Sequence, residues 1–403
     1  MSNNLRWTDN RQYGLQENLE GVKSVLQNFA VEQVHRVERF HHTYEGFSKT
    51  PLRSLDFLAT HLGVNKIFVK DEAYRFGLNA FKVLGGIYAI GQYVAKLLGK
   101  PIDNLSFEQL KLPEIKEQLG ELTFISTTDG NHGRGVAWAA RELGCKARIY
   151  MPVGSAEERL QNIKNEGAYA EITTMNYDDT VRYTSQLAED NGWVVIQDTM
   201  WEGYEEIPLW IMQGYTTLAK EAVDQLEEAP THVFLQAGVG SFAGALVAFL
   251  QQFYGQQLTF VLVEPDAANC FYESFKQGTE HFVTVGGDMQ TIMAGLACGE
   301  PNPMAWDILK TYTKVSISCG EHIAATGMRV LANPLSSDQP IVAGESGAAP
   351  FGCFYELMTN EDYKDLKAAL QLNTQSNILF VNTEGDTDVK NYRNIVWHGK
   401  YAK

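Results

Sequence analysis

The sequence has few of the features that mark membrane or secreted proteins. It contains no apolar run of the roughly 18 residues that a membrane-spanning helix needs. Its first residues, MSNNLRWTDN, hold no apolar segment behind a basic one, so no signal peptide is expected. These absences favour a protein of the cytoplasm.

Cysteine is also scarce, and its spacing is irregular. The five cysteines stand at positions 145, 270, 298, 319 and 353, and none forms a Cys-x-x-Cys or zinc-finger pattern. An odd, scattered set is typical of a chain whose thiols stay reduced inside the cell. Cys270 and Cys298 both lie in loop-like stretches, and the sequence leaves open whether these two pair.

Positive charge is the minority charge. The chain has 33 Lys and Arg residues against 49 Asp and Glu residues, a formal net charge of −16. Such an acidic surface argues against binding to nucleic acid or to an anionic membrane. At 403 residues the chain also exceeds the size at which one core stops growing, so two domains are expected.

Apolar, β-branched stretches alternate with amphipathic helices along most of the chain. This alternation is typical of parallel sheets covered by helices on both faces, so we expect an α/β fold with two open, twisted, mostly parallel sheets flanked by helices. One helix is expected over 19–39, before the alternation begins. The clearest expected strands are 66–70, 122–127, 147–152, 232–238, 259–265, 314–318 and 377–383.

Lys82 stands in an apolar setting within RFGLNAFKVLGG, residues 75–86. Phe81 precedes it and Val83 and Leu84 follow it. A lysine that loses water contacts has a lowered pKa and becomes a nucleophile toward carbonyl groups. The alternative is an ordinary solvated lysine at the start of a helix.

Three polar loops follow expected strands, where open α/β sheets bind their ligands. The first, QAGVGSFAG (236–244), has glycines that let backbone N–H groups turn toward a phosphate at a helix start, and it does not fit the Walker pattern. The second is TTDGNHG (127–133), and the third is FVNTEGDTD (380–388). The simpler alternatives are a helix cap for the second loop and a solvated turn for the third.

Taken in order, these motifs resemble those of the fold type II pyridoxal-phosphate enzymes, a superfamily that includes threonine and serine dehydratases. The motifs are Asn-Ala-Phe-Lys at 79–82, Thr-Asp-Gly-Asn-His-Gly at 128–133, the glycine-rich 238–241 and Thr383. Longer stretches such as KDEAYRFGLNAFKVLGG and VGGDMQTIMAGLACGEPNP are similar to the diaminopropionate ammonia-lyase family within it. The likeness begins at about residue 50. We expect a large discontinuous domain, 1–83 plus 205–403, and a small domain, 84–204.

The resemblance implies the place of the cofactor, pyridoxal 5′-phosphate. Lys82 is expected to bind it covalently, Asn131 to hydrogen-bond its phenolic oxygen, and Thr383 to face its pyridine nitrogen. A hydroxyl at that point does not hold a proton on the nitrogen, which suits elimination. The backbone expected to hold the phosphate is that of Gly238, Val239, Gly240 and Ser241.

The implied reaction is the α,β-elimination of 2,3-diaminopropionate, as the L and the D isomer, to pyruvate and two ammonia molecules. Lys82 is the natural base, because it lies next to Cα. Asp129 stands where dehydratases place a small or hydroxyl residue. Its carboxylate attracts a second ammonium by about 4 kcal/mol at ~4 Å and an effective dielectric constant of ~20, which favours a diamino acid over serine. Asp129 is also the expected base for the D isomer; otherwise it caps a helix.

Other positions are expected to complete the site. Asp198 is expected to face the substrate, and Glu345 resembles an acidic position near the cofactor in relatives. No metal ligands are expected, and relatives are typically homodimers. The alternatives are a threonine/serine dehydratase and a non-catalytic pyridoxal-phosphate carrier. The remaining expected substrate-binding residues are Thr128, Gly130 and His132, and the alternative for His132 is a residue that stabilises the loop.

Overall fold

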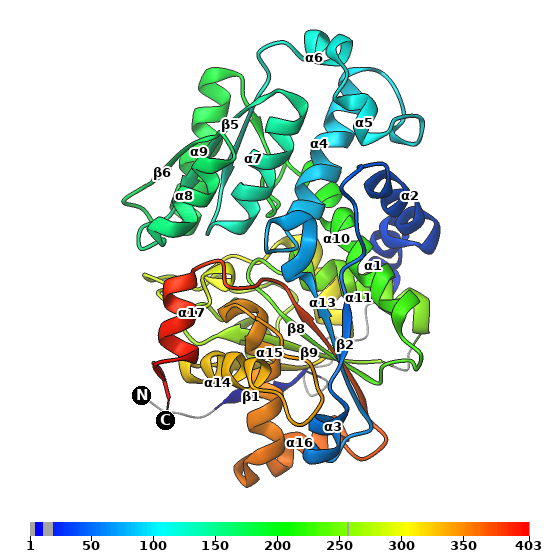
Figure 1. Cartoon of the computed structure of the whole chain (residues 1–403), viewed down its shortest axis with the longest axis vertical. Helices are drawn as coiled ribbons and strands as arrows, with labels where there is room; N and C mark the ends of the chain where they lie inside the picture. Colours follow the sequence, from blue (N-terminus) through cyan, green and yellow to red (C-terminus); the bar gives the residue numbers. More distant parts are fainter. Residues whose placement is uncertain (1–4, 11–18, 256–257, 403) are drawn as a thin grey trace.

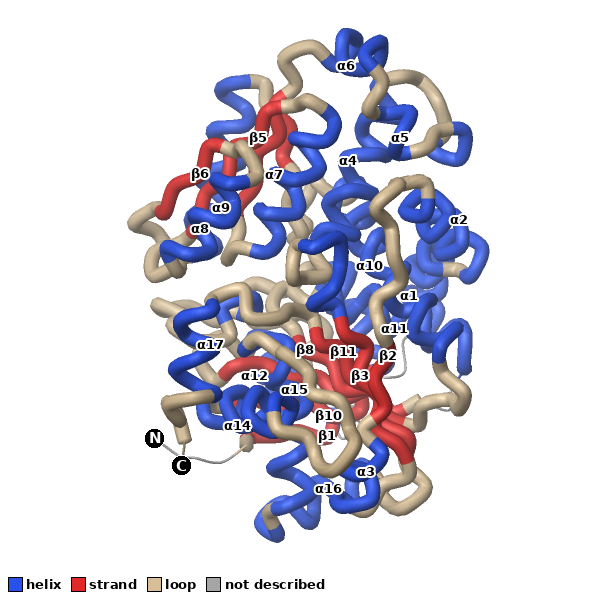
Figure 2. The backbone as a smooth tube through the Cα atoms, viewed as in Figure 1, coloured by secondary structure: helices blue, strands red, loops and turns tan. Residues whose placement is uncertain are grey.

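The computed structural model describes residues 5–10, 19–255 and 258–402, and the strands in these ranges form two sheets (Figures 1 and 2). The larger sheet has seven strands in the order β1-β10-β9-β8-β11-β3-β2. The smaller has four, in the order β6-β5-β4-β7. This confirms the expected fold class.

The seven-stranded sheet is parallel except at its two edges. Its strands are β1 (Arg6–Asp9), β2 (Leu52–Ser54), β3 (Lys66–Asp71), β8 (His232–Gln236), β9 (Thr259–Pro265), β10 (Thr313–Cys319) and β11 (Asn377–Asn382). The edge strands β1 and β2 run antiparallel to β10 and β3. The central strands β8 and β11 are buried along their whole length, as expected for a parallel sheet covered on both faces. The short edge strands are the ones that the sequence pattern did not indicate.

The four-stranded sheet is parallel throughout. Its strands are β4 (Thr123–Thr127), β5 (Lys146–Met151), β6 (Tyr169–Ile172) and β7 (Val194–Val195). In sequence it lies wholly between β3 and β8 of the larger sheet, so the larger sheet is built from two separate segments. The exact domain boundaries, at 83/84 and 204/205, stay a prediction.

Helix α4 (Val83–Leu97) packs directly against helices from both halves of the molecule. These are α7 (Asn131–Leu143), beside the smaller sheet, and α10 (Glu206–Gln225) (Figure 1). A Cβ added to Gly135 would lie 2.8 Å from Val83 Cα, and one added to Gly214 would lie 2.5 Å from the Leu84 carbonyl oxygen. The backbones therefore approach as closely as glycine allows.

The remaining helices cover the faces of the two sheets or connect them. In chain order they are α1 (Leu19–Leu26), α2 (Val31–His42), α3 (Asp56–Leu62), α5 (Phe107–Leu110), α6 (Pro113–Leu119), α8 (Glu157–Asn165), α9 (Tyr177–Asn191), α11 (Ser241–Tyr254), α12 (Cys270–Gln277), α13 (Pro303–Tyr312), α14 (Glu321–Ala332), α15 (Glu345–Thr359), α16 (Lys364–Leu370) and α17 (Val389–Val396).

The single helix expected over 19–39 is wrong. The chain leaves the helical conformation at Ala30, with ψ 150°, and separates α1 from α2. At the break, side chains of two other helices donate hydrogen bonds to the backbone carbonyls. Gln252 donates to the carbonyl of Leu26 at 2.8 Å, and Gln213 donates to that of Asn28 at 2.9 Å. Tertiary hydrogen bonds thus replace the helical ones.

All five cysteines are free thiols. Cys270 Sγ donates to the backbone carbonyl of Cys298 at 3.7 Å, so these two residues are neighbours without a disulfide between them. Among the described residues, no helix combines the length and the apolar character that crossing a bilayer requires.

Candidate active site

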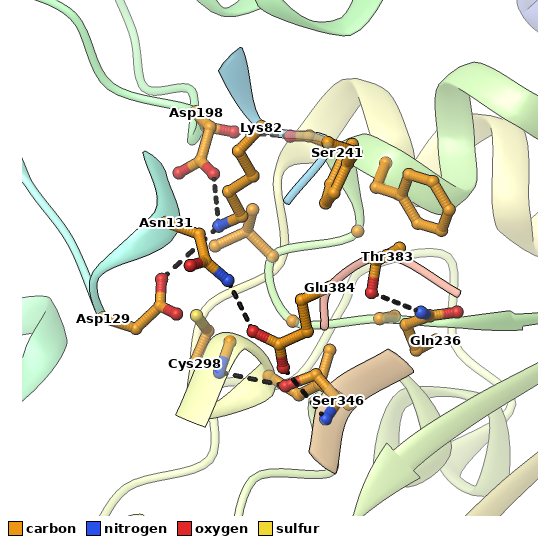
Figure 3. Close-up of a pocket in the computed structure, with 18 of the residues that line it drawn as sticks. Lys82, Asp129, Asn131, Asp198, Gln236, Ser241, Cys298, Ser346, Thr383 and Glu384 are labelled. Atoms are coloured by element: carbon orange, nitrogen blue, oxygen red, sulfur yellow. Dashed lines mark hydrogen bonds and ion pairs between the residues drawn. The ribbon is translucent and has the colours of Figure 1, made fainter. Parts of the chain in front are cut away.

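A cavity opens where the loops after β4, β8 and β11 meet the start of α4 (Figure 3). It therefore lies at the carboxyl ends of strands from both sheets. Of the residues expected from the sequence, it is lined by Lys82, Asp129, Asn131, Asp198, Gly238, Val239, Gly240, Ser241 and Thr383. Further lining residues are Phe81, Tyr177, Tyr215, Gln236, Ala237, Phe242, Gly295, Leu296, Cys298, Ser346 and Glu384.

Lys82 lies at the start of α4 with its amine between two carboxylates (Figure 3). Its Nζ donates to Asp198 Oδ2 at 3.1 Å and lies 3.6 Å from Asp129 Oδ1. Burial lowers the pKa of Lys82, but the two carboxylates raise it more, so the pKa lies well above its usual value. The lowered pKa expected from the sequence is therefore wrong, because only the apolar neighbours along the chain were visible there.

This charge state sets a requirement for reactivity. An ammonium group is not a nucleophile, so Lys82 must lose its proton before it bonds to a carbonyl carbon. Asp198 and Asp129 are the acceptors within reach.

Asp198 connects the lysine to the glycine-rich loop. Burial raises the pKa of Asp198, but the positive charge of Lys82 and the hydrogen bonds that the carboxylate accepts together have the larger effect, and the pKa falls to about 2. The hydroxyl of Tyr177 donates to Asp198 Oδ1 at 3.3 Å, and the hydroxyl of Ser241 donates to the Asp198 backbone carbonyl at 2.5 Å. Asp198 was expected only as a substrate contact. In the structure it is an ionised partner of the lysine.

Asp129 does not cap the following helix. The N-cap residue of α7 is Gly130, and the side chain that accepts from the first turn of the helix is that of Thr128, not Asp129. Instead Asp129 Oδ2 accepts from Nη1 of Arg159 at 3.2 Å, while its other oxygen faces Lys82. Thr128 supports the turn, because its Oγ1 accepts from Gly130 N at 2.8 Å and from Gly133 N at 2.9 Å.

Three expected substrate-binding residues, Thr128, Gly130 and His132, do not line the cavity. His132 is buried behind the loop, with Nε2 2.8 Å from the carbonyl oxygen of Ile196. Burial lowers the pKa of His132, which favours the neutral imidazole. The expected roles of these three residues at the substrate stay predictions.

The loop from Gly238 to Ser241 joins β8 to the N-terminus of α11. Within the described part of the chain, the amides of Gly238, Val239 and Gly240 donate to no backbone carbonyl. Gly240 has φ +88°, and a Cβ there would lie 2.3 Å from Cζ of Phe271. Unpaired amides at the start of a 14-residue helix are suited to a phosphate, because the helix dipole adds positive potential.

Thr383 lies just past the end of β11, across the cavity from the lysine (Figure 3). Its Oγ1 accepts a hydrogen bond from Nε2 of Gln236 at 2.8 Å. That bond leaves the hydroxyl proton of Thr383 free to be donated to a ring nitrogen. Asn131 donates from Nδ2 to Glu384 Oε2 at 2.5 Å. An amine, a row of unpaired amides and a hydroxyl therefore line one cavity, and this set fits pyridoxal phosphate.

Several lining residues were not expected from the sequence. Gln236 and Glu384 lie in two of the three loops singled out from the sequence, so their position next to expected residues could have identified them. Tyr215 comes from the middle of α10, where nothing in the pattern marks it. Glu345, expected near the cofactor, is buried at the start of α15 outside the lining.

Comparisons with known proteins agree with this geometry. The sequence profile of the pyridoxal-phosphate dependent enzyme family matches residues 44–384. Diaminopropionate ammonia-lyase of Escherichia coli (strain K12) is 53% identical over 379 residues, 93% of this chain and 94% of that protein. The crystal structure of the Escherichia coli enzyme in complex with D-serine has a TM-score of 0.91 and 48% identity, and covers 99% of this chain and 98% of that one. The crystal structure of the same enzyme in complex with an aminoacrylate-PLP azomethine reaction intermediate has a TM-score of 0.90 and 48% identity, and covers 100% of this chain and 99% of that one.

Proposed function

Because the chain belongs to the diaminopropionate ammonia-lyases, within the pyridoxal-phosphate-dependent enzymes, we propose that it eliminates ammonia from 2,3-diaminopropionate. The products are pyruvate and two molecules of ammonia. The observation that carries the choice of substrate is the pair of buried carboxylates, Asp129 and Asp198, on either side of Lys82. A substrate with a second ammonium group gains attraction from such a site, whereas serine gains none for its hydroxyl.

Pyridoxal phosphate, when bound, supplies an electron sink that makes the α-proton of an amino acid acidic. Lys82 is the residue that would hold it covalently, and the amides of Gly238 to Ser241 would hold its phosphate. Thr383 would donate a hydrogen bond to the ring nitrogen without protonating it, and Asn131 would reach the phenolic oxygen. The hydroxyl proton of Thr383 and the amides of the glycine-rich loop have no described acceptor at the cavity, which supports their roles.

Proton transfer is assigned to two residues. Lys82 removes the α-proton of the L isomer. Asp129, in the loop between β4 and α7, removes the α-proton of the D isomer. The β-nitrogen arrives as an ammonium group attracted by Asp129 and leaves as neutral ammonia, so its departure needs no proton donor. Asp198 keeps Lys82 in place and exchanges a proton with it.

Asp129 also separates this function from its nearest rival. A threonine/serine dehydratase uses the same cofactor and the same loops, but its substrates carry a neutral β-hydroxyl. Burying the carboxylate of Asp129, even paired with Arg159, then costs free energy without improving substrate binding. The site therefore supports the diamino acid over the hydroxyamino acid.

The test is a set of steady-state assays on purified protein loaded with pyridoxal phosphate. We expect pyruvate from L- and D-diaminopropionate, with kcat/KM at least ~100-fold above that for serine or threonine. Borohydride reduction followed by mass spectrometry should place the cofactor on Lys82, and Lys82→Ala should lose both the adduct and the activity. Lys96→Ala, at an exposed lysine of the same helix, is the control. Comparable rates with serine would assign the chain to the dehydratases instead.

Two wider features complete the proposal. The protein acts as a homodimer in the cytoplasm, and the sequence divides into domains 1–83 plus 205–403 and 84–204. The scattered, unpaired cysteines support the compartment. Light scattering after size-exclusion chromatography measures the oligomeric state, and a monomer at micromolar concentration would contradict the dimer.

A further inference from the structure

Arg159 connects the candidate catalytic carboxylate to two acids on the other side of the molecule. Its Nη1 donates to Asp129 Oδ2 at 3.2 Å. Its Nη2 lies 3.7 Å from Glu345 Oε2 and 3.6 Å from Glu384 Oε2. Arg159 belongs to α8, beside the smaller sheet, whereas Glu345 and Glu384 belong to α15 and to the loop after β11. One guanidinium therefore bridges both halves of the site.

The position of Arg159 is unusual for its helix. The two residues before it, Glu157 and Glu158, are exposed, whereas only 4% of the Arg159 side chain is exposed. Its aliphatic stem packs beneath the turn that carries Asp129. A Cβ added to Gly130 would lie 2.9 Å from Cδ of Arg159. The stem and the turn are thus fitted to each other, independently of charge.

The charges explain why this arginine remains buried. Burial alone lowers the pKa of Arg159, but Glu384, Glu345 and Asp129 raise it above its usual value. Burying an unpaired guanidinium or carboxylate costs several kcal/mol, so Arg159 and the acids around it stabilise one another. Glu345 has a second partner, since Asn391 donates from Nδ2 to its Oε1 at 2.6 Å. Asp129 has only Arg159 and Lys82 as charged partners among the described residues.

Asp129 therefore lies between two competing cations. If Lys82 were its sole partner, the two proposed bases would neutralise each other in a closed pair. Arg159 holds one carboxylate oxygen at 3.2 Å, closer than the 3.6 Å between the other oxygen and Lys82. The guanidinium cannot give up a proton, so it holds the carboxylate without protonating it.

We propose that Arg159 is a positioning residue that holds the Asp129 carboxylate in place and separate from Lys82, so that Asp129 acts as the base for the D isomer. This assignment rests on the proposed function. It predicts a selective effect, because Lys82 serves the other isomer without help from Arg159.

The test compares Arg159→Gln, Arg159→Lys and wild type with both isomers. In Arg159→Gln, kcat/KM for the isomer that depends on Asp129 should fall about 100-fold, the scale of one general base, while the other isomer should lose less than about threefold. Arg159→Lys should restore part of the rate, since a lysine keeps the charge but not the fork of donors.

Two further measurements and a control variant distinguish a positioning effect of Arg159 from a loss of folding. The absorbance of bound pyridoxal phosphate and the melting temperature report whether the variants are loaded and folded. Arg134→Gln is the matched control, because Arg134 is a partly buried arginine of α7 that pairs with Glu166 and not with Asp129. Its ratio of D to L rates should equal that of wild type.

The outcomes distinguish the two proposals. Equal losses with both isomers would overturn the assignment of Arg159 while wild-type activity stood. If Arg159→Gln does not fold, Arg159→Lys decides. A threefold or greater fall in the D-to-L ratio supports positioning, and an unchanged ratio overturns it. Wild-type protein that releases no pyruvate from either isomer would overturn the proposed function, and the role of Arg159 with it.

Discussion

Lys82 and Asp198 form a buried ion pair, with Nζ of the lysine 3.1 Å from Oδ2 of the aspartate. The pair joins the start of α4 to the segment after β7. Through its backbone carbonyl, Asp198 also accepts the Ser241 hydroxyl of the glycine-rich loop. The residue proposed to bind the cofactor is therefore held by the same aspartate that contacts the proposed phosphate site.

Asp198→Asn should make the lysine easier to deprotonate. Burial lowers the pKa of Lys82, and Asp198 is the larger of the two carboxylate influences that raise it. Without that charge, apo-protein should capture pyridoxal phosphate faster near neutral pH, and the rate profile should move to lower pH. Stopped-flow absorbance across pH measures this. A profile that coincides with wild type would show that the ion pair does not control the amine.

Asp129→Asn should separate the two isomers. Activity with the isomer that needs Asp129 as base should fall about 10²- to 10⁴-fold, whereas the other isomer should lose activity mainly through a higher KM. Asp288→Asn is the control, because Asp288 is an exposed acid that shares a neighbouring cleft with Asp129. Full activity of Asp129→Asn with D-diaminopropionate would contradict the second-base role.

Gly240→Ala should weaken cofactor binding. Its Cβ would lie 2.3 Å from Phe271 Cζ, so the loop would have to shift its amides, and pyridoxal-phosphate affinity should fall at least about tenfold, or about 1.4 kcal/mol. Gly167→Ala is a matched control with φ +86° and no atom within 4 Å of the added Cβ. This variant introduces the strain of an alanine at positive φ without a steric clash. Equal cofactor affinities in the two variants would contradict the phosphate-loop assignment.

Stability should fall as the pH rises from about 4.5 to 8, in part because of Glu264. Burial raises the pKa of Glu264 to about 8, although the amides of Phe271 and Tyr272 donate to its carboxylate. Within that window the native state holds a proton that the unfolded chain has released. The free energy of unfolding therefore declines by at most about 1.4 kcal/mol per pH unit from this group.

Glu264→Gln should remove this contribution, because an amide does not titrate. Urea unfolding at several pH values between about 5 and 8 measures the slope for wild type and variant. Glu273→Gln, at a more exposed acid of α12, the helix whose amides donate to Glu264, should keep most of the wild-type slope. Parallel curves for wild type and Glu264→Gln would show that Glu264 is ionised throughout.

The sequence predicted most central strands because their pattern is local. A strand such as β8 or β11 is buried on both faces, so its apolar run is visible without knowledge of its neighbours. The break at Ala30 was not visible, since it depends on Gln213 and Gln252 from other helices. The edge strands β1 and β2 have four and three residues, too few to establish a period.

At the site too, features encoded by neighbouring residues were predictable, and features set by residues distant in sequence were not. The loops that carry Lys82, Asp129 and Gly240 follow strands and were found by position and residue type. The charge state of Lys82 was predicted wrongly, because it is set by carboxylates that are distant in sequence. Arg159 was not singled out, since an arginine in a polar helix gives no local sign of being buried.

The direct backbone contact of α4 with both α7 and α10 has a mechanical consequence. No side chains separate these helices at Gly135 and Gly214, so a swing of the four-stranded sheet has to hinge on α4 rather than slide along it. Lys82 is next to that hinge, whereas Asp129 and Asn131 are carried on the swinging part. Opening the cleft to admit an amino acid would then carry those two side chains away from a nearly stationary amine.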